Sequence, residues 1–288
     1  MDLAKSTLKN SPPRADNSVA TKLISVSRRN ALGFLAAAGT GFAQQRRTAA
    51  PPELLGRGAY PLGVSMYLQP LGDRVTLASK QQLAITATLA DSSEKSSVSI
   101  QVQQPNKVLI QRAGAKAATL SWDGATSRST SAAPRKDEDD LLETFASDFP
   151  DAFFSAVMSG GGVRLLGQGF RPAARDYAGP AWDVFELLVG AGVRRSGQTQ
   201  VKRFYFDHAT RLLGSTRYNL TTAGSGPSGT VWVETHYSSW RELSGTLLPT
   251  RVERYEGGAL RFAIDVTNVT ARAKDNDNIF QTVGPAKV

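Results

Sequence analysis

Few side chains in this sequence are suited to acid–base, nucleophilic or metal chemistry. The chain of 288 residues has two histidines, His208 and His236, and no cysteine. The lack of cysteine excludes thiolate zinc sites, iron–sulfur clusters, cysteine nucleophiles, disulfides and lipid attachment through a cysteine. The sequence also lacks a Gly-x-Ser-x-Gly elbow, a phosphate-binding glycine loop and a His-Glu-x-x-His pair. We therefore expect no catalytic residue, metal or cofactor, and a binding protein rather than an enzyme.

The carboxylates leave two alternatives to this interpretation. Glu186, Glu234 and Glu253 fall in predicted strands that can bring two acids together, as in a glycoside hydrolase, but nothing in their spacing selects a pair. The acidic run 137–140 lacks the glycine and the further acid of a calcium loop. Negative charge is favourable in the first turn of a helix, so we interpret this run as a helix start. An exported hydrolase remains the alternative from the enzyme class.

Large apolar side chains between residues 141 and 158 are the most informative feature. They recur at spacings of three and four residues, which predicts helix, and Pro150 divides the segment into two short helices with a joint. Each such side chain contributes ~1.5–3 kcal/mol when it is buried, either as ordinary core or as the wall of an apolar cavity. We predict that five of them bind a ligand: Phe145, Phe149, Phe153, Phe154 and Met158.

Most of the remaining chain has the pattern of strands. Apolar residues alternate with polar ones over 82–89 and 98–102, and short apolar stretches follow. Seven segments rich in branched and aromatic residues fill the second half: 163–166, 182–189, 200–206, 211–220, 230–240, 247–255 and 260–271. Short turns join them, which favours antiparallel pairing. About eleven strands are too many for one flat sheet. We predict a mainly β, α+β fold: a strongly curved antiparallel sheet, an incomplete barrel, with short helices packed on its concave side.

The N-terminal residues have the pattern of a targeting signal. A basic lead with Arg28 and Arg29 precedes an alanine- and glycine-rich apolar stretch that ends at Ala43. Residues 1–43 thus resemble a twin-arginine export signal cleaved after Ala43, although Ala31 stands where that signal usually has phenylalanine. We assign 44–74 to a linker and irregular segment and 75–288 to the folded domain. The mature protein is expected in the periplasm without a transmembrane span, because no apolar run reaches the ~18–20 residues that a bilayer requires.

The charge of the chain does not indicate a nucleic-acid partner. The net charge is +9 and the sequence pI is about 9.9. In the predicted mature part, however, most basic residues are interspersed with acids. This pattern is typical of a solvated surface of mixed charge rather than a phosphate-binding patch.

Several short motifs occur in an order that resembles a known family. They are Gln104-Pro105-Asn106, Trp122-Asp123-Gly124, Tyr205-Phe206-Asp207, Tyr237-Ser238-Ser239-Trp240, Leu248-Pro249-Thr250-Arg251 and Asp277-Asn278-Ile279-Phe280. Together they are similar to the periplasmic lipoprotein-carrier superfamily, the LolA-like group that also contains the MucB-like regulators. The resemblance covers about residues 75–281.

The resemblance implies an incomplete barrel whose helices form a lid over an apolar cavity, and binding of acyl chains or lipoproteins without catalysis. The matching motifs are turns and core residues, so no ligand contact is carried over to a numbered position. We therefore expect an exported, non-catalytic protein that binds a lipid, acyl chain or lipoprotein in the periplasm. The alternative is a periplasmic protein-interaction or regulatory module of the same fold, whose partner is a protein.

Overall fold

The structure, a computed structural model, describes residues 62–71, 81–104, 107–131, 135–158, 162–172, 178–189, 200–221, 229–274, 277–281 and 283. The chain divides into two compact units. The larger unit, Ala50–Arg171 with Ala178–Val288, holds every described residue except Pro172. The predicted signal, 1–43, lies outside the described residues, and of the predicted linker, 44–74, only 62–71 are described.

Twelve strands of the described chain form one sheet. They are β1 (Gln81–Asp91), β2 (Lys95–Gln103), β3 (Lys107–Arg112), β4 (Ala118–Trp122), β5 (Ser127–Ser129), β6 (Val163–Phe170), β7 (Trp182–Val189), β8 (Gln200–Asp207), β9 (Leu213–Thr221), β10 (Thr230–Leu243), β11 (Thr246–Glu256) and β12 (Ala259–Ala273). Their order is β5-β4-β3-β2-β1-β12-β11-β10-β9-β8-β7-β6, and all neighbours are antiparallel. The sheet is open, with β5 and β6 at its edges.

Short helical segments accompany the sheet. They are α2 (Leu62–Leu68), η1 (Gln69–Leu71), α4 (Lys136–Glu143), η2 (Thr144–Asp148), α5 (Pro150–Met158) and η3 (Asp277–Phe280), of which η2 is a turn of π-helix. Phe149 is extended, with φ −63° and ψ 148°, so the predicted joint lies directly before Pro150. Among the described residues no helix has the length and apolar character needed to cross a bilayer.

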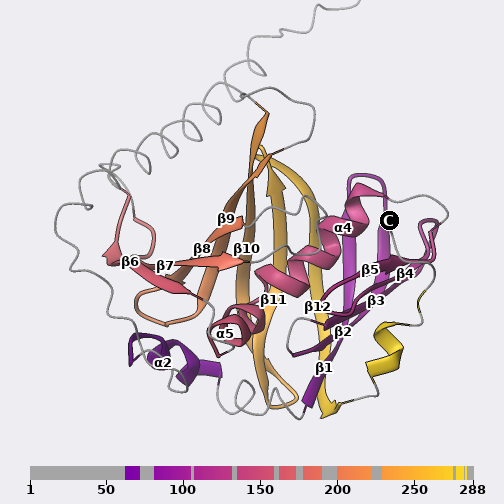
Figure 1. Ribbon diagram of the computed structural model, residues 1–288, viewed down its shortest axis with the longest axis horizontal. Helices are drawn as coiled ribbons and strands as arrows, with labels where there is room; N and C mark the ends of the chain where they lie inside the picture. Colours follow the sequence, from indigo (N-terminus) through magenta and orange to yellow (C-terminus); the bar gives the residue numbers. More distant parts are fainter. Residues whose placement is uncertain are drawn as a thin grey trace, which may run out of the picture. The chain divides into compact units, whose positions relative to one another are not determined.

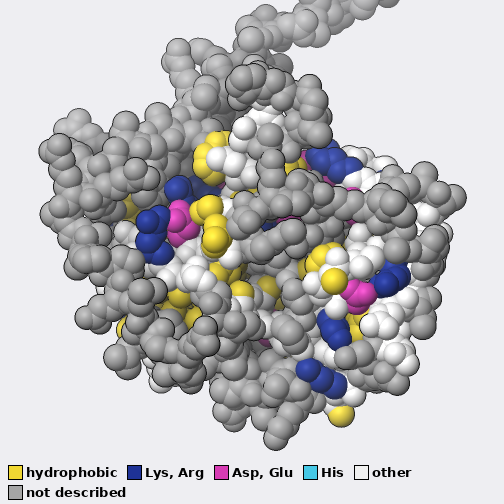
Figure 2. All heavy atoms as spheres, in the orientation of Figure 1, with side chains coloured by type: hydrophobic (Ala, Val, Ile, Leu, Met, Phe, Trp, Pro, Cys, Tyr) yellow, Lys and Arg dark blue, Asp and Glu magenta, His cyan; other side chains and the backbone are white. Residues whose placement is uncertain are grey.

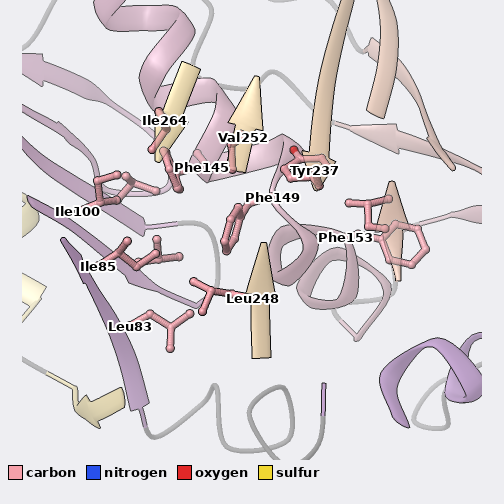
Figure 3. Packing of buried hydrophobic residues seen from close by; sticks show 14 of the residues in the cluster. Leu83, Ile85, Ile100, Phe145, Phe149, Phe153, Tyr237, Leu248, Val252 and Ile264 are labelled. Atoms are coloured by element: carbon pink, nitrogen blue, oxygen red, sulfur yellow. The ribbon is translucent and has the colours of Figure 1, made fainter. Parts of the chain in front are cut away.

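The main apolar core lies between α4, η2 and α5 and one face of the curved sheet, as Figure 1 shows for the helices and strands. Residues alternate on each strand, so one side of it enters this core: on β2, Val98, Ile100 and Val102 are buried. Figure 3 shows Phe145 and Phe149 among Ile85 of β1, Ile100 of β2 and Leu248 of β11. The predicted fold class, a mainly β curved antiparallel sheet with short helices on one face, is confirmed.

Candidate functional site

Four of the five predicted ligand-binding residues come together in the main core. Phe145 belongs to η2, Phe149 to the joint, and Phe153 and Phe154 to α5. Each of the four side chains is at most 1% exposed. Met158 is the last residue of α5, and its side chain lies outside the described part of the structure. These side chains recur every three or four residues, so they lie on the same, buried side of the helices.

An aromatic cluster fixes α5 to the sheet. The Phe153 ring centroid is 4.8 Å from that of Phe204 and 5.2 Å from that of Phe206, both on β8. Phe185 on β7 is 5.7 Å away. Tyr67 of α2 reaches the same cluster, 4.9 Å from Phe206 and 5.0 Å from Phe185. Rings at these separations attract one another beyond the area they bury, so the cluster holds α2 and α5 against β7 and β8.

A hollow elsewhere on the sheet does not involve these rings. It has a volume of about 370 Å³ and lies over β10, β11 and β12; its lining residues are Ser239, Arg241, Leu243, Thr250, Arg251, Asp265, Val266 and Thr267. The four phenylalanines are instead packed against other apolar side chains. In this conformation the interior beneath the helices is therefore filled by the protein's own residues where the phenylalanines lie.

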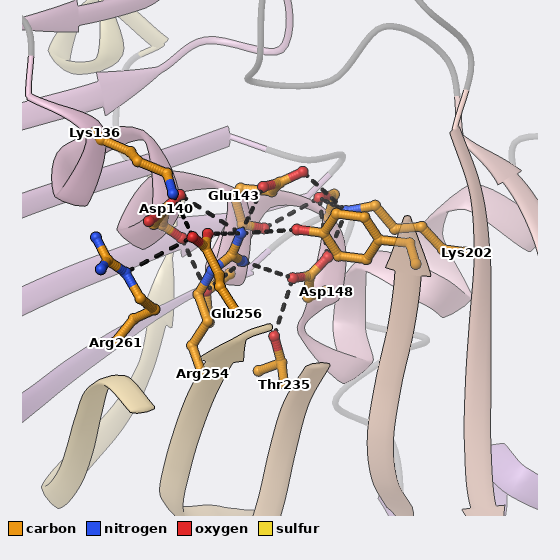
Figure 4. Close-up of polar contacts among 12 residues, drawn as sticks. Lys136, Asp140, Glu143, Asp148, Lys202, Thr235, Arg254, Glu256 and Arg261 are labelled. Carbon is orange, nitrogen blue, oxygen red and sulfur yellow. Dashed lines mark hydrogen bonds and ion pairs between the residues drawn. The ribbon is translucent and has the colours of Figure 1, made fainter. Parts of the chain in front are cut away.

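A buried network of charges lies beneath the same helices (Figure 4). Arg254 on β11 and Lys202 on β8 have side chains that are 0% and 1% exposed. Both face the carboxylates of Glu143, at the end of α4, and of Asp148, at the end of η2. Sequence reasoning missed this network. A signal was present, because the alternation that points Phe204 and Phe206 inward also points Lys202 inward.

Each of the two carboxylates bridges both cations. Asp148 Oδ1 accepts a hydrogen bond from Lys202 Nζ at 2.5 Å, and its Oδ2 accepts from Arg254 Nη1 and from Thr235 Oγ1, both at 3.2 Å. Glu143 Oε2 accepts from Arg254 Nη2 at 3.0 Å, and its Oε1 accepts from Lys202 Nζ at 3.3 Å. Donors from β8, β10 and β11 therefore converge on Asp148.

The electrostatics of this network keep Arg254 charged. Burial by itself lowers the pKa of Arg254, but its neighbours Tyr218, Glu143 and Asp148 raise it well above the usual value. Tyr218 Oη accepts a hydrogen bond from Arg254 Nη2 at 2.9 Å. Lys202 Nζ lies over the Tyr218 ring, 4.1 Å from its centroid. The charges are thus neutralised by ion pairs, hydrogen bonds and a cation–π contact, which is what a buried charge requires.

The acidic run 137–140 does more than begin a helix. Three of its residues lie in the first turn of α4, as predicted, but two of the four side chains are buried. Asp140 approaches Arg254 Nη2 to 3.6 Å. Glu138 accepts hydrogen bonds from Ser129 Oγ and from Arg135 Nε, at 2.9 and 2.8 Å. The interpretation as a helix start was therefore incomplete, because tertiary ion pairs determine how half of the run is placed.

A second buried acid, Asp183 on β7, ties α2 to the turn between β8 and β9. Its side chain accepts hydrogen bonds from Tyr67 Oη at 2.7 Å, the Gly169 amide at 2.8 Å and Arg211, and it contacts His208 Nδ1 at 2.7 Å. Burial alone raises the pKa of Asp183, but the hydrogen bonds of Tyr67, His208 and Gly169 lower it on balance. His208 thus contributes to the ion pairs and hydrogen bonds that hold this turn.

The other acids considered from the sequence lie at partly exposed positions and form ion pairs with arginines. Glu186 pairs with Arg164 and Arg203, Glu234 with Arg217, and Glu253 with Arg251. Burial alone raises the pKa of Glu234, but His236 and Arg217 lower it on balance, which is unsuitable for a general acid at neutral pH.

The described surface is one of mixed charge. Figure 2 shows basic and acidic side chains beside one another on the face it presents, as expected for a solvated surface. Among the described residues, no group of three or more histidine, cysteine, aspartate and glutamate side chains is arranged to hold a metal ion.

Comparisons with known proteins are consistent with this geometry at the level of the fold. No protein-family model and no curated protein matches the chain. A LolA superfamily protein from Nitrosomonas europaea has 11% sequence identity and a TM-score of 0.50, covering 75% of this chain and 96% of its own. A DUF1329 family protein from Desulfovibrio piger has 11% identity, coverage of 76% and 96%, and a TM-score of 0.44. A MucB structure has 13% identity, coverage of 81% and 66%, and a TM-score of 0.30.

The first of these similarities establishes the class of fold. An open, curved antiparallel sheet with short helices on one face, matched over most of a LolA superfamily structure, is a LolA-like fold. Because the sequence identity is low, the similarity defines the fold and not the ligand.

Proposed function

We propose that this protein is an exported, non-catalytic carrier that binds a lipid, an acyl chain or a lipoprotein in the periplasm. The observation that carries the proposal is the apolar interior between the sheet and the short segment α4–η2–α5, in which four aromatic side chains from the helices meet rings and aliphatic groups from the strands. The LolA-like fold supports it. The buried acids and bases are arranged in ion pairs, which suits a binding protein better than a hydrolase.

The ligand site in this proposal is lined by Phe145, Phe149, Phe153, Phe154 and Met158. An acyl chain enters when α4–η2–α5 moves away from the sheet, and its methylene groups then replace ring contacts that the closed form makes within itself. The exchange keeps apolar surface out of water in both states, so the apolar contacts contribute little to the net cost of opening. A π-helical turn followed by the extended Phe149 provides the joint for this movement, because such irregular turns bend more readily than a regular helix.

Native mass spectrometry of the mature protein after gentle extraction tests the proposal. We expect a bound species of lipid mass that disappears on delipidation, and rebinding of a fluorescent C16 fatty acid. Phe153→Leu should alter the affinity for this probe several-fold. Leu188→Ala, a control on β7 with a side chain that is 58% exposed, should not. Absence of bound lipid together with no rebinding of the probe would contradict the carrier function.

The alternative, a protein-interaction or regulatory module of the same fold, is favoured by an apolar surface patch. Leu188 on β7 and Val201 on β8 are directly opposite each other and are 58% and 47% exposed. Contiguous exposed apolar surface is a feature of many protein interfaces, and this pair would form part of one. A pull-down from periplasm that recovers one partner and no lipid, and that is lost in a Leu188→Ser/Val201→Ser variant, would favour this alternative. Recovery of the same partner by the variant would argue against it.

We also propose that residues 1–43 are an export signal of the twin-arginine type, removed after Ala43. The arginine pair Arg28–Arg29 ahead of a moderately apolar stretch supports this proposal. Replacing the pair by Lys-Lys should leave the protein in the cytoplasm with its full mass. Normal export and processing of that variant would contradict the assignment.

A further inference from the structure

Within the buried network around Arg254, the signs of the charges divide between the helices and the sheet. Asp140, Glu143 and Asp148 belong to α4 and η2, whereas Lys202 and Arg254 belong to β8 and β11. One acid departs from this division: Glu256 on β11 pairs with Lys136 of α4 and with Arg261 of β12. The helices therefore supply the anions that neutralise the two deeply buried cations of the sheet.

Movement of the helices affects the two cations unequally. Both carboxylates that contact Lys202, those of Glu143 and Asp148, leave with the helices. Arg254 loses the same two partners and Asp140 but keeps Glu256, 3.6 Å away on its own strand. A charge left in an apolar interior without a partner is strongly disfavoured. A ligand that enters the opened interior is therefore favoured when it brings a negative charge to Lys202.

In the interior, the buried cations Lys202 and Arg254 lie directly beside apolar side chains. On β8 the inward side chains are Lys202, Phe204 and Phe206 in succession, and on β11 Val252 precedes Arg254 on the same face. Successive inward residues on a strand are about 7 Å apart, so on both strands an apolar side chain lies about 7 Å from the cation. This arrangement complements a molecule with an anionic head and an apolar chain.

We propose that Lys202, Arg254 and Thr235 bind the anionic head group, a phosphate or a carboxylate, of an amphiphile whose chain lies against the phenylalanines of the interior. In the closed form the Asp148 carboxylate occupies this place as an internal competitor. It already accepts hydrogen bonds from Lys202, Arg254 and Thr235, on three different strands. Asp148 directly precedes the joint at Phe149, so opening at the joint withdraws it. This inference rests on the proposed carrier function and specifies the chemistry of its ligand.

Three ligands with the same C12 chain test the inference: laurate, dodecyl phosphate and the neutral dodecyl maltoside, each below its micelle concentration. We expect the delipidated mature protein to bind at least one anionic ligand about tenfold more tightly than the maltoside, the effect of one or two charge-assisted hydrogen bonds. Lys202→Gln should abolish that preference, so that the anionic ligands bind no more tightly than the maltoside does to the same variant. Asp148→Asn, which weakens the internal competitor, should strengthen anionic binding. Laurate and dodecyl phosphate distinguish carboxylate from phosphate recognition.

Arg203→Gln is the matched control, because Arg203 adjoins Lys202 in sequence but forms a partly exposed ion pair with Glu186. It should retain the preference for anionic ligands. Circular dichroism checks that each variant is folded, and Glu143→Gln replaces Asp148→Asn if that variant is not. Equal binding of all three ligands, or an unchanged preference in Lys202→Gln, would overturn the inference while the carrier function stands. Binding of none of them would contradict the carrier function itself.

Discussion

Replacing Arg254 by methionine isolates the contribution of the buried network to stability. Methionine retains an unbranched apolar chain of similar reach but removes the guanidinium. The variant loses hydrogen bonds to Asp148, Glu143 and Tyr218, at 3.2, 3.0 and 2.9 Å. Lys202 is then left as the one cation bonded to both Glu143 and Asp148. The helices α4 and η2 consequently lose their ion pairs with Arg254, and the pair of Lys136 with Glu256 still links α4 to β11.

The magnitude follows from the burial of these groups. Removing one partner from a buried ion pair costs roughly 3–5 kcal/mol, because the remaining charge is left partly uncompensated. Arg251 lies three residues away on the same strand, and its Nη1 donates to both carboxylate oxygens of Asp265, each at 2.7 Å. Its side chain is 33% exposed, and exposed pairs contribute at most about 1 kcal/mol. Arg254→Met should therefore cost at least three times as much as Arg251→Met.

Urea unfolding of the mature protein and the two variants, followed by circular dichroism, measures the difference. We expect a lower midpoint for Arg254→Met with little change in the dependence on urea concentration, which is the sign of lost stability rather than altered compactness. Equal losses in the two variants, or a loss below about 1 kcal/mol for Arg254→Met, would refute the reasoning. The ion pairs beneath α4 and η2 would then contribute no more than surface pairs.

Three further predictions concern other contacts. Tyr67→Phe removes a 2.7 Å hydrogen bond to buried Asp183 and should cost about 1–3 kcal/mol in thermal unfolding, unless Asp183 finds another donor. The lowered pKa of Asp183 stabilises the folded protein above the unfolded pKa of about 3.9, and this stability is lost as pH falls through the folded value. The midpoint of urea unfolding should therefore fall as the pH is lowered, and it should fall less in Asp183→Asn. In Gly214→Ala the new Cβ would lie 2.3 Å from the Trp182 ring, so the variant should be destabilised, whereas Gly162→Ala, with open space, should not.

The sequence predicted most strands because their signals are local. The segment 182–189 coincides with β7, and 200–206 with all but the last residue of β8. Alternation and turn residues define such elements without reference to the rest of the chain. The pairing of β1 with β12, residues almost two hundred positions apart, has no local signal. It follows from the need to bury apolar faces on both strands, which only the complete fold satisfies.

Only the apolar half of the candidate site could be predicted from the sequence, because only that half has a local signal. The apolar face of the helices is evident from the spacing of Phe145, Phe149 and Phe153, whose period matches a helix. The acidic face depends on partners far away: Asp148 and Arg254 are 106 residues apart in sequence. Local reasoning assigns acids near a helix start to its dipole, and it has no means of placing a cation from another strand beneath them.

The helical segment thus has two buried faces, and this limits what can replace it on the sheet. An apolar chain alone restores the contacts of Phe149 and Phe153 but leaves Lys202 without a carboxylate. A small anion alone restores the ion pairs but leaves the rings exposed. Apolar side chains often replace buried ion pairs without loss of stability, so stability by itself gives little reason to keep these charges. The proposed ligand, with an anionic head and an apolar chain, does give a reason, because only such a molecule would replace both sets of contacts.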